Sequence, residues 1–596
     1  MNNLPPSSED SENPLALIYS RQDAESLFAG GLTCRAVLAM TPNAQAALAG
    51  CSHKIIVSTS VLDDRAHLKI VARTRRLDRA IQNLLEHSTG IAETAKITLA
   101  SDLHYMAASA LGLWIMLGRR GPWLVPMSNG QWTIITSRIA ALTALVTHLR
   151  RTGSPVRAWL QVPALANLVR ALNRSAVRIS ARDCQVAIPG RSYGMANLAE
   201  EIFKRHAKRT VEVRGATGNW HDFIHPLRTL YQALTGQAII TAIAAPKSQD
   251  NVKFILEKVW SGIPDVVVRE GLMPYRNEII TESMLTQSLA DEMAEILNGT
   301  AVQSIMLNAL HWGADVALAE AAGRHGLPRF LISHGSHTLG HTLAADAEQR
   351  ALAEGQLVSP LADIAITQSP YGDALAADMN PALERRPYRP SMWGYKKLPQ
   401  SATAPRTRQI LHAGTYKKLI GLRPWIYETS NEFTDGLVDL IHAVEGVGDT
   451  HLIIRFRPMA ECDLDALRKL LPRSDCYEIK ISGSFLDDLA ATDLLVSYAS
   501  TTIEESLNAR RPVLLWGGTR RYRHVPAETA PPSVKRRASV YTAEGVEHLS
   551  NILPAILDCH AGKPLTDIEL AGHVWPFGTP GVSELADAIA DAQALA

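Results

Sequence analysis

Residues 494–516, LLVSYASTTIEESLNARRPVLLW, constrain the fold of this chain more than any other stretch. They open with an apolar run that ends at Ser497, which is typical of a buried parallel strand. Hydroxyl-bearing residues then stand where a helix would begin: Ser500, Thr501 and Thr502. Glu504 and Glu505 fall in the first helical turn, where acidic side chains complement the helix dipole. The stretch therefore predicts a strand–turn–helix–strand unit whose helix starts at the carboxyl edge of a parallel sheet.

A helix that begins at such an edge can bind an anion, because its free backbone N–H groups and its dipole both favour negative charge. The hydroxyl groups of the turn can add hydrogen bonds. The same residues also fit an ordinary helix cap, since the pattern S/T-x-x-E is common at helix starts. Taken alone, the stretch leaves both a phosphate site and a structural cap open.

The alternation of strand and helix patterns extends over residues 407–596 and predicts a doubly wound parallel sheet, that is, a Rossmann-like domain. Residues 396–406 precede it, and their prolines and small polar residues are typical of a linker. Residues 15–395 also alternate strand and helix patterns, with long helical insertions, and predict another α/β domain. Residues 1–14 are polar and acidic and are expected to be disordered. The predicted fold class is therefore α/β, with two Rossmann-like domains.

The composition of the chain narrows the classes of function open to it. The formal net charge is +1 over 596 residues, which argues against nucleic acid as a partner. The six cysteines lack CxxC spacing, so neither a disulfide framework nor a zinc site is expected. The amino terminus lacks the pattern of a signal peptide, and the longest apolar stretch, residues 106–117, is too short to span a bilayer. We expect a cytoplasmic protein, and peripheral association with the inner face of a membrane stays open.

Four sequence blocks between residues 300 and 560 resemble a known family in their order and spacing. They are LISHGSHT (331–338), ADIAITQSPYG (362–372), LIIRFRP (452–458) and DLLVSYASTTIEESLNARRPVLLW (493–516). In these blocks the chain is similar to bacterial GT-B glycosyltransferases that build capsule, lipopolysaccharide O-antigen and other surface carbohydrates. The resemblance implies two Rossmann-like domains that face each other across a cleft and hold a nucleotide sugar between them. The chain departs from it at Arg457-Pro458, where sialyl- and Kdo-transferase-like relatives carry His-Pro, and this argues against a CMP-sugar donor.

The resemblance implies a metal-independent donor site in the carboxyl-terminal domain. Helix N-termini and arginines would stabilise the leaving nucleotide phosphate. The residues implied in donor binding are Gly414, Thr415, Arg455, Arg457, Ser500, Thr501, Thr502, Glu504 and Glu505. Only one of the adjacent glutamates can face the donor, where its carboxylate can accept two hydrogen bonds from the ribose diol. An ion pair of Arg457 with Glu461 and a purely dipolar role for the glutamates remain as alternatives.

His334 and Glu270 are the candidates for the chemical step. His334 follows an apolar strand and precedes a glycine, and a histidine there can act as a base toward the acceptor hydroxyl. A capped histidine of the core is the alternative. Glu270 follows the run DVVVR, which predicts a strand, and would act as a base or a nucleophile. His334, His337 and His341 share helical spacing, but the intervening glycines favour a loop, so no metal site is expected.

These inferences predict a glycosyltransferase that moves a sugar from a nucleotide-sugar donor to a glycan or lipid-linked acceptor in bacterial surface polysaccharide biosynthesis. No cofactor besides the donor substrate is expected. Two alternatives share the fold: a teichoic-acid-type CDP-polyol phosphotransferase, and a non-catalytic scaffold that has lost the chemistry. The net charge of +1 disfavours the phosphotransferase, because a polyanionic product calls for a more basic surface.

Overall fold

The computed structural model describes most of the chain. The described residues are 13–127, 129–150, 171–190, 193–207, 209–216, 231, 234, 238–244, 250–311, 313–389, 407–414, 428–456 and 463–592. The predicted linker at residues 396–406 lies outside the described residues, as do residues 1–12 of the amino-terminal segment that is expected to be disordered.

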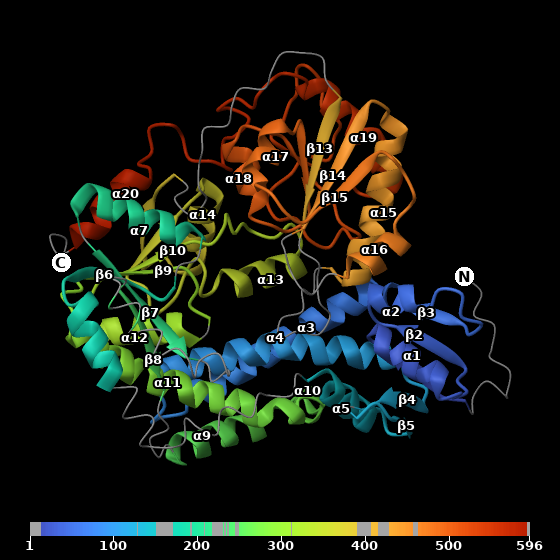
Figure 1. Ribbon diagram of the computed structural model, residues 1–596, viewed down its shortest axis with the longest axis horizontal. Coiled ribbons are helices and arrows are strands. Elements are labelled where there is room, and N and C mark those ends of the chain that lie inside the picture. Colours follow the sequence, from blue (N-terminus) through green and yellow to red (C-terminus); the bar gives the residue numbers. More distant parts are fainter. Residues whose placement is uncertain are drawn as a thin grey trace.

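Three sheets organise the described chain into an amino-terminal, a central and a carboxyl-terminal unit (Figure 1). Their strand orders are β3-β2-β1-β4-β5, β12-β11-β10-β9-β6-β7-β8 and β15-β14-β13-β16-β17-β18. When the strands of each sheet are counted along the chain, every sheet contains the order 3-2-1-4-5, which is that of a doubly wound Rossmann fold. The predicted α/β class with Rossmann-like domains is therefore confirmed. Residues 15–395 contain two such sheets rather than one.

The amino-terminal unit has a mostly parallel sheet, in which only β4 and β5 pair as an antiparallel hairpin. Its strands are β1 (Leu15–Ile18), β2 (Ala36–Ala39), β3 (Ile55–Val57), β4 (Trp123–Pro126) and β5 (Trp132–Ile135). Its helices are α1 (Arg21–Ala29), α2 (Pro42–Ala47), α3 (Asp64–Glu86), α4 (Glu93–Leu117) and α5 (Arg138–Leu149). Ser20 and Asp23 form a capping box at the start of α1, which fixes where the chain turns from strand into helix.

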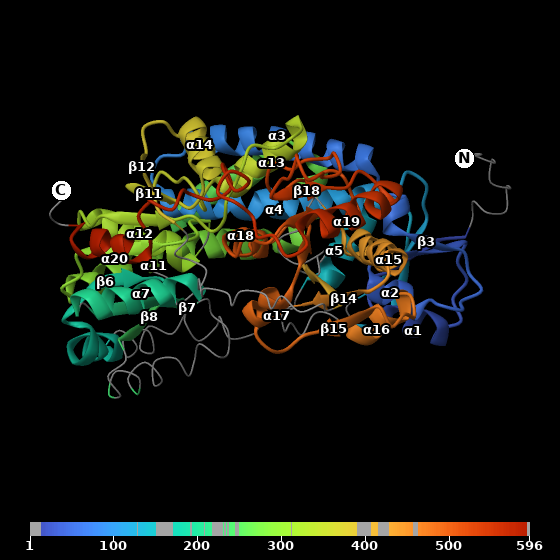
Figure 2. The same ribbon diagram turned by 90° about the horizontal axis from the view of Figure 1, so that it is seen from above.

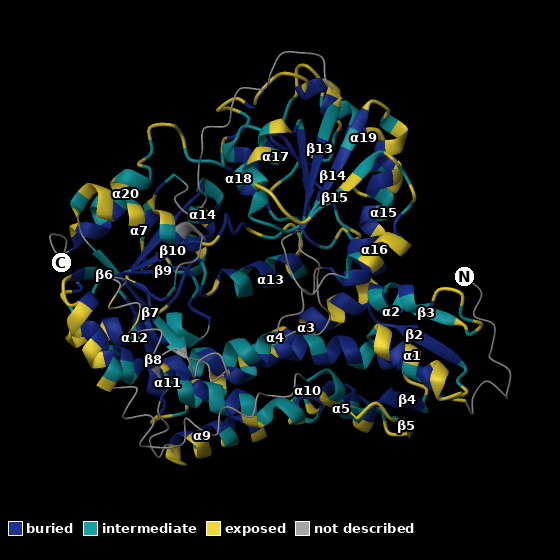
Figure 3. Cartoon of the chain, viewed as in Figure 1, coloured by how far each residue is buried: buried dark blue, intermediate teal, exposed yellow. Residues whose placement is uncertain are grey.

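The central unit has a fully parallel sheet. Its strands are β6 (Cys184–Ile188), β7 (Arg209–Ala216), β8 (Ile239–Ile243), β9 (Ser304–Leu307), β10 (Arg329–Ile332), β11 (Ile364–Thr367) and β12 (Glu384–Pro387). Its helices are α7 (Tyr193–His206), α9 (Asp250–Ser261), α10 (Val266–Gly271), α11 (Arg276–Asn298), α12 (Gly313–Arg324), α13 (Leu343–Ala353) and α14 (Pro370–Met379). The inner strands β9 and β11 are largely apolar and completely buried, because helices cover both sides of a parallel sheet, and Figure 3 shows the inner strands in the dark colour of buried residues.

The carboxyl-terminal unit also has a fully parallel sheet. Its strands are β13 (Arg408–Ala413), β14 (Thr450–Arg455), β15 (Tyr477–Lys480), β16 (Leu494–Ser497), β17 (Val513–Leu515) and β18 (Val540–Thr542). Its helices are α15 (Ser430–Val447), α16 (Leu464–Leu470), α17 (Phe485–Ala491), α18 (Thr502–Asn508) and α19 (Val546–His560). The strand–turn–helix–strand unit predicted for residues 494–516 is confirmed as β16, α18 and β17.

α3 and α4 form a long hairpin that ties the amino-terminal unit to the central one (Figures 1 and 2). Leu77, Ile81 and Leu85 recur on one face of α3 and are buried, and α3 packs on α4. α4 also packs on α5, α11 and α12. A helix surrounded in this way must be apolar on most sides, and buried residues are found along the whole length of α4.

The chain returns to the central unit after the carboxyl-terminal sheet. A last helix, α20 (Val582–Ala590), packs on α7 and β9, and its Leu585 and Ile589 belong to an apolar cluster of the central unit. Trp575 Nε1 donates to the carbonyl oxygen of Thr367 at the end of β11 (2.9 Å). Residues 407–596 therefore do not form one closed domain, because their last helix completes the central unit.

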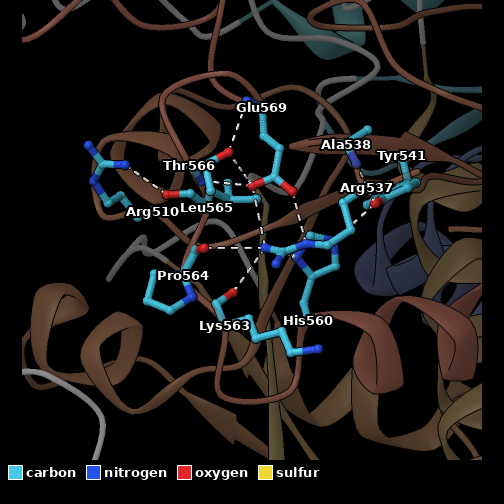
Figure 4. Close-up of polar contacts among 10 residues, drawn as sticks. All are labelled: Arg510, Arg537, Ala538, Tyr541, His560, Lys563, Pro564, Leu565, Thr566 and Glu569. Carbon is cyan, nitrogen blue, oxygen red and sulfur yellow. Dashed lines mark hydrogen bonds and ion pairs between the residues drawn. The ribbon is translucent and has the colours of Figure 1, made fainter. Parts of the chain in front are cut away.

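A polar network anchors the start of this return segment (Figure 4). Arg537 donates to the carbonyl oxygens of Lys563 (3.1 Å) and Pro564 (3.2 Å) and pairs with Glu569 (Nε–Oε1 2.9 Å). Glu569 in turn accepts from the amide of Thr566 (2.7 Å). These bonds hold residues 563–569 against the carboxyl-terminal unit before the chain crosses over.

The strand predicted for the run DVVVR is helical in the structure. Val266–Gly271 form α10, and Asp265 is the N-cap residue of this helix. Asp265 caps α10, because its carboxylate accepts from the amides of Val267 (3.1 Å) and Val268 (3.2 Å). The prediction of a strand before Glu270 is therefore wrong: capping and packing outweigh the β propensity of the valine run.

Candidate functional site

The strand ends of the carboxyl-terminal sheet bring together two of the predicted donor-binding segments. β13 and β16 are neighbours where the strand order reverses, which is where ligands bind in doubly wound folds. Ser497 Oγ donates to the carbonyl oxygen of Ala413 (2.7 Å) and ties the two strand ends together. Gly414 follows β13, and a Cβ at this position would lie only 2.9 Å from the ring of Phe433. Gly414 and the turn at Ser500 therefore lie at the same edge, and the packing there requires a glycine.

The turn before α18 makes little use of its hydroxyl groups. Thr501 occupies the N-cap position, but it has an α-helical conformation (φ −63°, ψ −7°) and its side chain makes no cap bond. Ser500 Oγ accepts from the amide of Thr502 over a long distance of 3.4 Å. Thr502 Oγ1 is buried and has no hydrogen-bond partner among the described residues. A structural cap therefore does not account for this row of hydroxyls.

Glu504 joins the carboxyl-terminal unit to the central unit. Its Oε1 accepts from the amide of Ser336, in the loop after β10 (2.8 Å), and from His524 Nε2 (2.9 Å). Thr338 Oγ1 reinforces the junction by donating to the carbonyl oxygen of His524 (3.3 Å). We call Ser336, His337, Glu504 and His524 the Glu504 cluster. The loop that contains His334 and the helix that follows Ser500 are thereby held in contact, although they belong to different sheets.

Glu504 is held as an ionised carboxylate although only 2% of the residue is exposed. Burial by itself raises its pKa, but the charge and the hydrogen bond of His524, together with the amide of Ser336, outweigh this effect and lower the pKa to about 2. Its second oxygen, Oε2, makes no hydrogen bond within the described part of the chain. The cluster therefore contains a charged oxygen that can still accept a hydrogen bond.

His337 is the neutral member of the Glu504 cluster. Burial lowers its pKa to about 3, and the nearby His334 and His524 lower it further against the opposing effect of Glu504. The backbone of His337 has a positive φ of 40°, an uncommon conformation for a residue with a side chain. Its Nε2 is buried and lacks a hydrogen-bond partner among the described residues. Strain and an unsatisfied ring nitrogen at one position are more often found at functional sites than in ordinary loops.

The carboxyl edges of β9 and β10 hold two candidate acid–base groups. His334 follows β10 and is exposed, and Asn308 Nδ2, after β9, contacts its Nδ1 at 3.3 Å. Asp315 lies near the start of α12 and accepts a hydrogen bond from the amide of Ala309. Burial raises the pKa of Asp315 to about 7 in spite of this bond. An imidazole and a protonatable carboxyl group thus occupy neighbouring strand ends.

Two predicted site residues are engaged elsewhere. Arg455 pairs with Asp488 on α17 and donates to the carbonyl oxygen of Ser482 (3.1 Å). Its guanidinium group therefore forms bonds within the carboxyl-terminal unit. Glu270 pairs with Arg269 (3.1 Å) on α10, a helix that packs on α4 and α5. The structure therefore does not bring Arg455 or Glu270 into the Glu504 cluster.

The remaining predictions divide between described and undescribed residues. Glu505 is half-buried on α18, and Glu504 is the one of the pair that faces the loop after β10. Thr415 and Arg457 lie outside the described residues. Their roles in donor binding stay predictions.

Sequence reasoning missed three residues: His524 at the junction, and Asn308 and Asp315 after β9. His524 lies in the irregular segment between β17 and β18, and no motif marks it in the sequence. Asn308 stands directly after β9, so a polar residue at the end of an apolar strand was the signal available. Asp315 offers a similar signal, because it is an acidic residue near a helix start at the carboxyl edge of the sheet.

Two features are absent from the described residues: a cluster of metal-ligating side chains and a membrane-spanning helix. Within them, no group of three or more His, Cys, Asp or Glu side chains is arranged to hold a metal ion. Likewise, no described helix combines the length and the apolar character that crossing a bilayer needs.

Comparisons with known proteins identify similar structures only. No family model matches the chain, and no curated protein sequence matches it. A Staphylococcus aureus MnaA–UDP structure is 10% identical with a TM-score of 0.40, over 70% of this chain and 98% of that one. Acinetobacter baumannii MurG is 9% identical with a TM-score of 0.34, over 68% and 99%. Phytolacca americana UGT2, in complex with UDP-2-fluoro-glucose and pterostilbene, is 10% identical with a TM-score of 0.35, over 69% and 94%. These sequence identities and TM-scores are low, so the assignment of the fold rests on the strand orders of the three sheets.

Proposed function

We propose that this chain is a glycosyltransferase that uses a nucleotide-sugar donor in the biosynthesis of a bacterial surface polysaccharide. The observation that carries the proposal is the Glu504 cluster, where loops at the carboxyl edges of two Rossmann-like sheets meet. Both edges are ligand-binding positions in this type of fold. A donor with a nucleotide at one end and a sugar at the other suits a site built from two such edges. Three of the four sequence blocks that resemble GT-B glycosyltransferases (331–338, 362–372 and 493–516) include the carboxyl ends of β10, β11 and β16, and the described part of the block at 452–458 includes the end of β14.

The nucleotide would bind at the ends of β13 and β16. Backbone N–H groups and hydroxyls of Ser500, Thr501 and Thr502 would bind the phosphates, with Gly414 at the neighbouring strand end. Glu504 Oε2 is the acceptor for a ribose hydroxyl, since Oε1 is already used within the cluster. Arg457 would add positive charge opposite the phosphates.

His334 would act as the base. It takes the proton of an acceptor hydroxyl, whose oxygen then attacks the anomeric carbon of the donor sugar. The bond from that carbon to the phosphate oxygen breaks, and its electron pair leaves with the nucleotide. For Nε2 to take this proton, Nδ1 must carry the ring hydrogen, and Asn308 would orient the imidazole with its amide turned so that the oxygen accepts from Nδ1–H. Asp315 is a second candidate base, because burial raises its pKa to about 7. The acceptor would be a glycan or a lipid-linked sugar.

Binding is tested first, by thermal unfolding in the presence of UDP, CMP, GDP and dTDP, each alone and as a sugar conjugate. A ligand at 100 times its Kd stabilises the folded state by about 2.7 kcal/mol, so one nucleotide should raise the midpoint clearly. The double variant Ser500→Ala, Thr502→Val should lose this rise. Ser550→Ala, which removes an exposed hydroxyl on α19, is the matched control. No response to any nucleotide, or an unchanged response in the double variant, would contradict the proposed donor site.

Catalysis is tested separately, by following release of the nucleotide from the donor that binds. His334→Ala should lower the rate about 10²- to 10⁴-fold, the usual contribution of a general base, with donor binding unchanged. His87→Ala removes an exposed imidazole at the end of α3 and serves as the control. If Asp315→Asn abolishes turnover while His334→Ala does not, the base is Asp315.

A further inference from the structure

A hollow between α3 and α4 lies apart from the Glu504 cluster, in the half of this hairpin that contains the end of α4. It encloses about 520 Å³, a volume typical of small-molecule sites. Its lining includes five basic side chains and no acidic one. We call these five residues the basic pocket: Lys69, Arg73, Arg76, Arg119 and Arg138.

The basic pocket is built by regular structure. Lys69, Arg73 and Arg76 are spaced by four and three residues, so they lie on one face of α3. Arg119 follows the end of α4, and Arg138 begins α5. Three elements of the amino-terminal unit thus direct cationic side chains toward one hollow.

Most of this charge is not neutralised by the protein. Arg73 pairs with Asp265 through three hydrogen bonds (Nη2–Oδ1 2.7 Å, Nη2–Oδ2 2.8 Å, Nε–Oδ2 3.0 Å). In the described ranges, no carboxylate lies within ion-pair distance (4.0 Å) of Lys69, Arg76 or Arg119, and all three are exposed. A chain with a net charge of +1 has thus concentrated unpaired cations around a single hollow.

Arg138 is held deeper in the pocket. Its guanidinium lies 3.7 Å from the centroid of the Trp114 ring and donates to the carbonyl oxygen of the same residue. Burial lowers the pKa of Arg138, and the positive charges of Arg119 and Arg73 lower it further. These groups therefore repel one another, and a bound anion would remove that repulsion.

The walls of the pocket between the cations are apolar. They are formed by Ile70, Leu111, Trp114 and Ile115. We propose that the basic pocket binds a phosphate-bearing anion, with the apolar walls in contact with the organic group attached to it. Arginine suits this ligand because its planar guanidinium can donate two parallel hydrogen bonds to a phosphate. The phosphate can belong to a lipid headgroup or to a soluble sugar phosphate or nucleotide.

The test compares two sources of phosphate on the full-length chain. Isothermal calorimetry with inorganic pyrophosphate measures the soluble source. Sedimentation with vesicles of phosphatidylglycerol and phosphatidylcholine, against phosphatidylcholine alone, measures the lipid source. The triple variant Lys69→Glu, Arg76→Glu, Arg119→Glu should weaken binding about 100-fold, since each cation near an anionic surface contributes about fivefold. Lys469→Glu, Arg473→Glu, Lys535→Glu makes the same charge change on exposed residues outside the pocket and should retain binding.

Each outcome decides the proposal. Pyrophosphate binding that the triple variant loses identifies a soluble phosphate ligand, and vesicle binding that it loses identifies a lipid headgroup. Binding to neither by the wild-type chain, or equal loss in the triple variant and in its control, overturns the basic pocket as an anion site. The nucleotide response at the Glu504 cluster should persist in the triple variant, so a failure here is distinguishable from a failure of the proposed function.

Discussion

The Glu504 cluster and the basic pocket differ in whether their charged groups are buried and hydrogen-bonded or exposed and without an acidic partner among the described residues. In the cluster a carboxylate is almost completely buried and is held by an amide and an imidazole. In the pocket three cations are exposed and lack an acidic partner among the described residues, and one of them, Arg119, helps to lower the pKa of the nearby Arg138. A buried charge that is hydrogen-bonded helps to hold the folded structure together. An exposed group of like charges slightly lowers the stability, and this cost is removed when an anion binds. Substitution of a charged residue should therefore change stability at the Glu504 cluster and ligand binding at the basic pocket.

Glu504→Ala should have the largest effect on stability. It leaves the buried Ser336 amide and His524 without their acceptor, and removal of one partner of a buried pair costs about 3–5 kcal/mol. Urea unfolding monitored by fluorescence measures the change. Glu504→Gln keeps the volume and one acceptor oxygen, so it should lose less. A cost below about 1 kcal/mol for Glu504→Ala, the range of an exposed ion pair, would mean that the cluster does not hold the two units together.

His337→Asn should change the pH dependence of stability. The folded-state pKa of His337 is about 3, below the ordinary value of 6.5, so the unfolded chain takes up a proton between these values and the folded chain does not. The stability due to neutral His337 is therefore present above pH 6.5 and falls as the pH is lowered toward 3. The slope from this group approaches about 1.4 kcal/mol per pH unit. Asparagine tolerates a positive φ, so the variant should fold and show a shallower loss.

Equal slopes in the two proteins between pH 6.5 and 4 would contradict the buried, neutral state of His337. The comparison must be made against the wild-type chain, because other buried histidines, such as His412 and His573, also have a pKa lowered to about 4 and contribute to the same loss.

Arg73→Ala should reduce stability to a smaller extent, because it removes the ion pair that Arg73 forms within the basic pocket. Among the described residues, Arg73 is the member of the pocket that pairs with a carboxylate, and this carboxylate, Asp265, also caps α10. The pair is half-buried, so its loss should cost about 1 kcal/mol, at the upper end of the range for exposed ion pairs. Differential scanning calorimetry can resolve a change of this size. If Arg73→Ala leaves the free energy of unfolding unchanged, the ion pair with Asp265 makes no measurable contribution to stability.

Single substitutions of Lys69, Arg76 and Arg119 by alanine should have the smallest effect. Surface substitutions away from specific interactions usually change stability by less than about 0.5 kcal/mol. Removing a repelling cation should shift unfolding in the stabilising direction, and more so at low salt, where charges are less screened. Destabilisation by more than about 1 kcal/mol, beyond that usual range, would show a structural role for the cation concerned.

The sequence predicted the carboxyl-terminal sheet well because each of its central strands is a short apolar run between turn residues. Residues 494–516 folded as expected for that reason. The division of residues 15–395 into two sheets could not be predicted, because the α3–α4 hairpin separates β3 from β4 within one sheet. The strand expected before Glu270 failed because the side chain of Asp265 caps a helix, an effect that the valine run masks.

The candidate site was only partly accessible to sequence reasoning. The resemblance implied two Rossmann-like domains that face each other across a cleft, and in the structure Glu504 links the loop after β10 to the helix that follows Ser500. His524 also bonds to Glu504, but it lies in an irregular segment between β17 and β18, and no sequence pattern predicts where such a segment lies in the fold. The hollow of the basic pocket depends on the packing of α3, α4 and α5, which periodicity alone does not give.

The return of the chain through α20 has a mechanical consequence. The carboxyl-terminal unit is connected to the central unit by two covalent passages, one after Arg389 and one before Gly581, and the amide of Arg389 donates to the carbonyl oxygen of Pro580 (2.7 Å). The chain therefore leaves the central unit and re-enters it at two positions that are hydrogen-bonded to each other. Because both connections start from nearly one point, they do not by themselves fix the orientation of the carboxyl-terminal unit. That orientation depends on side-chain contacts between the units, such as the bond from the Ser336 amide to Glu504 and the bond from Asn431 to Ser58.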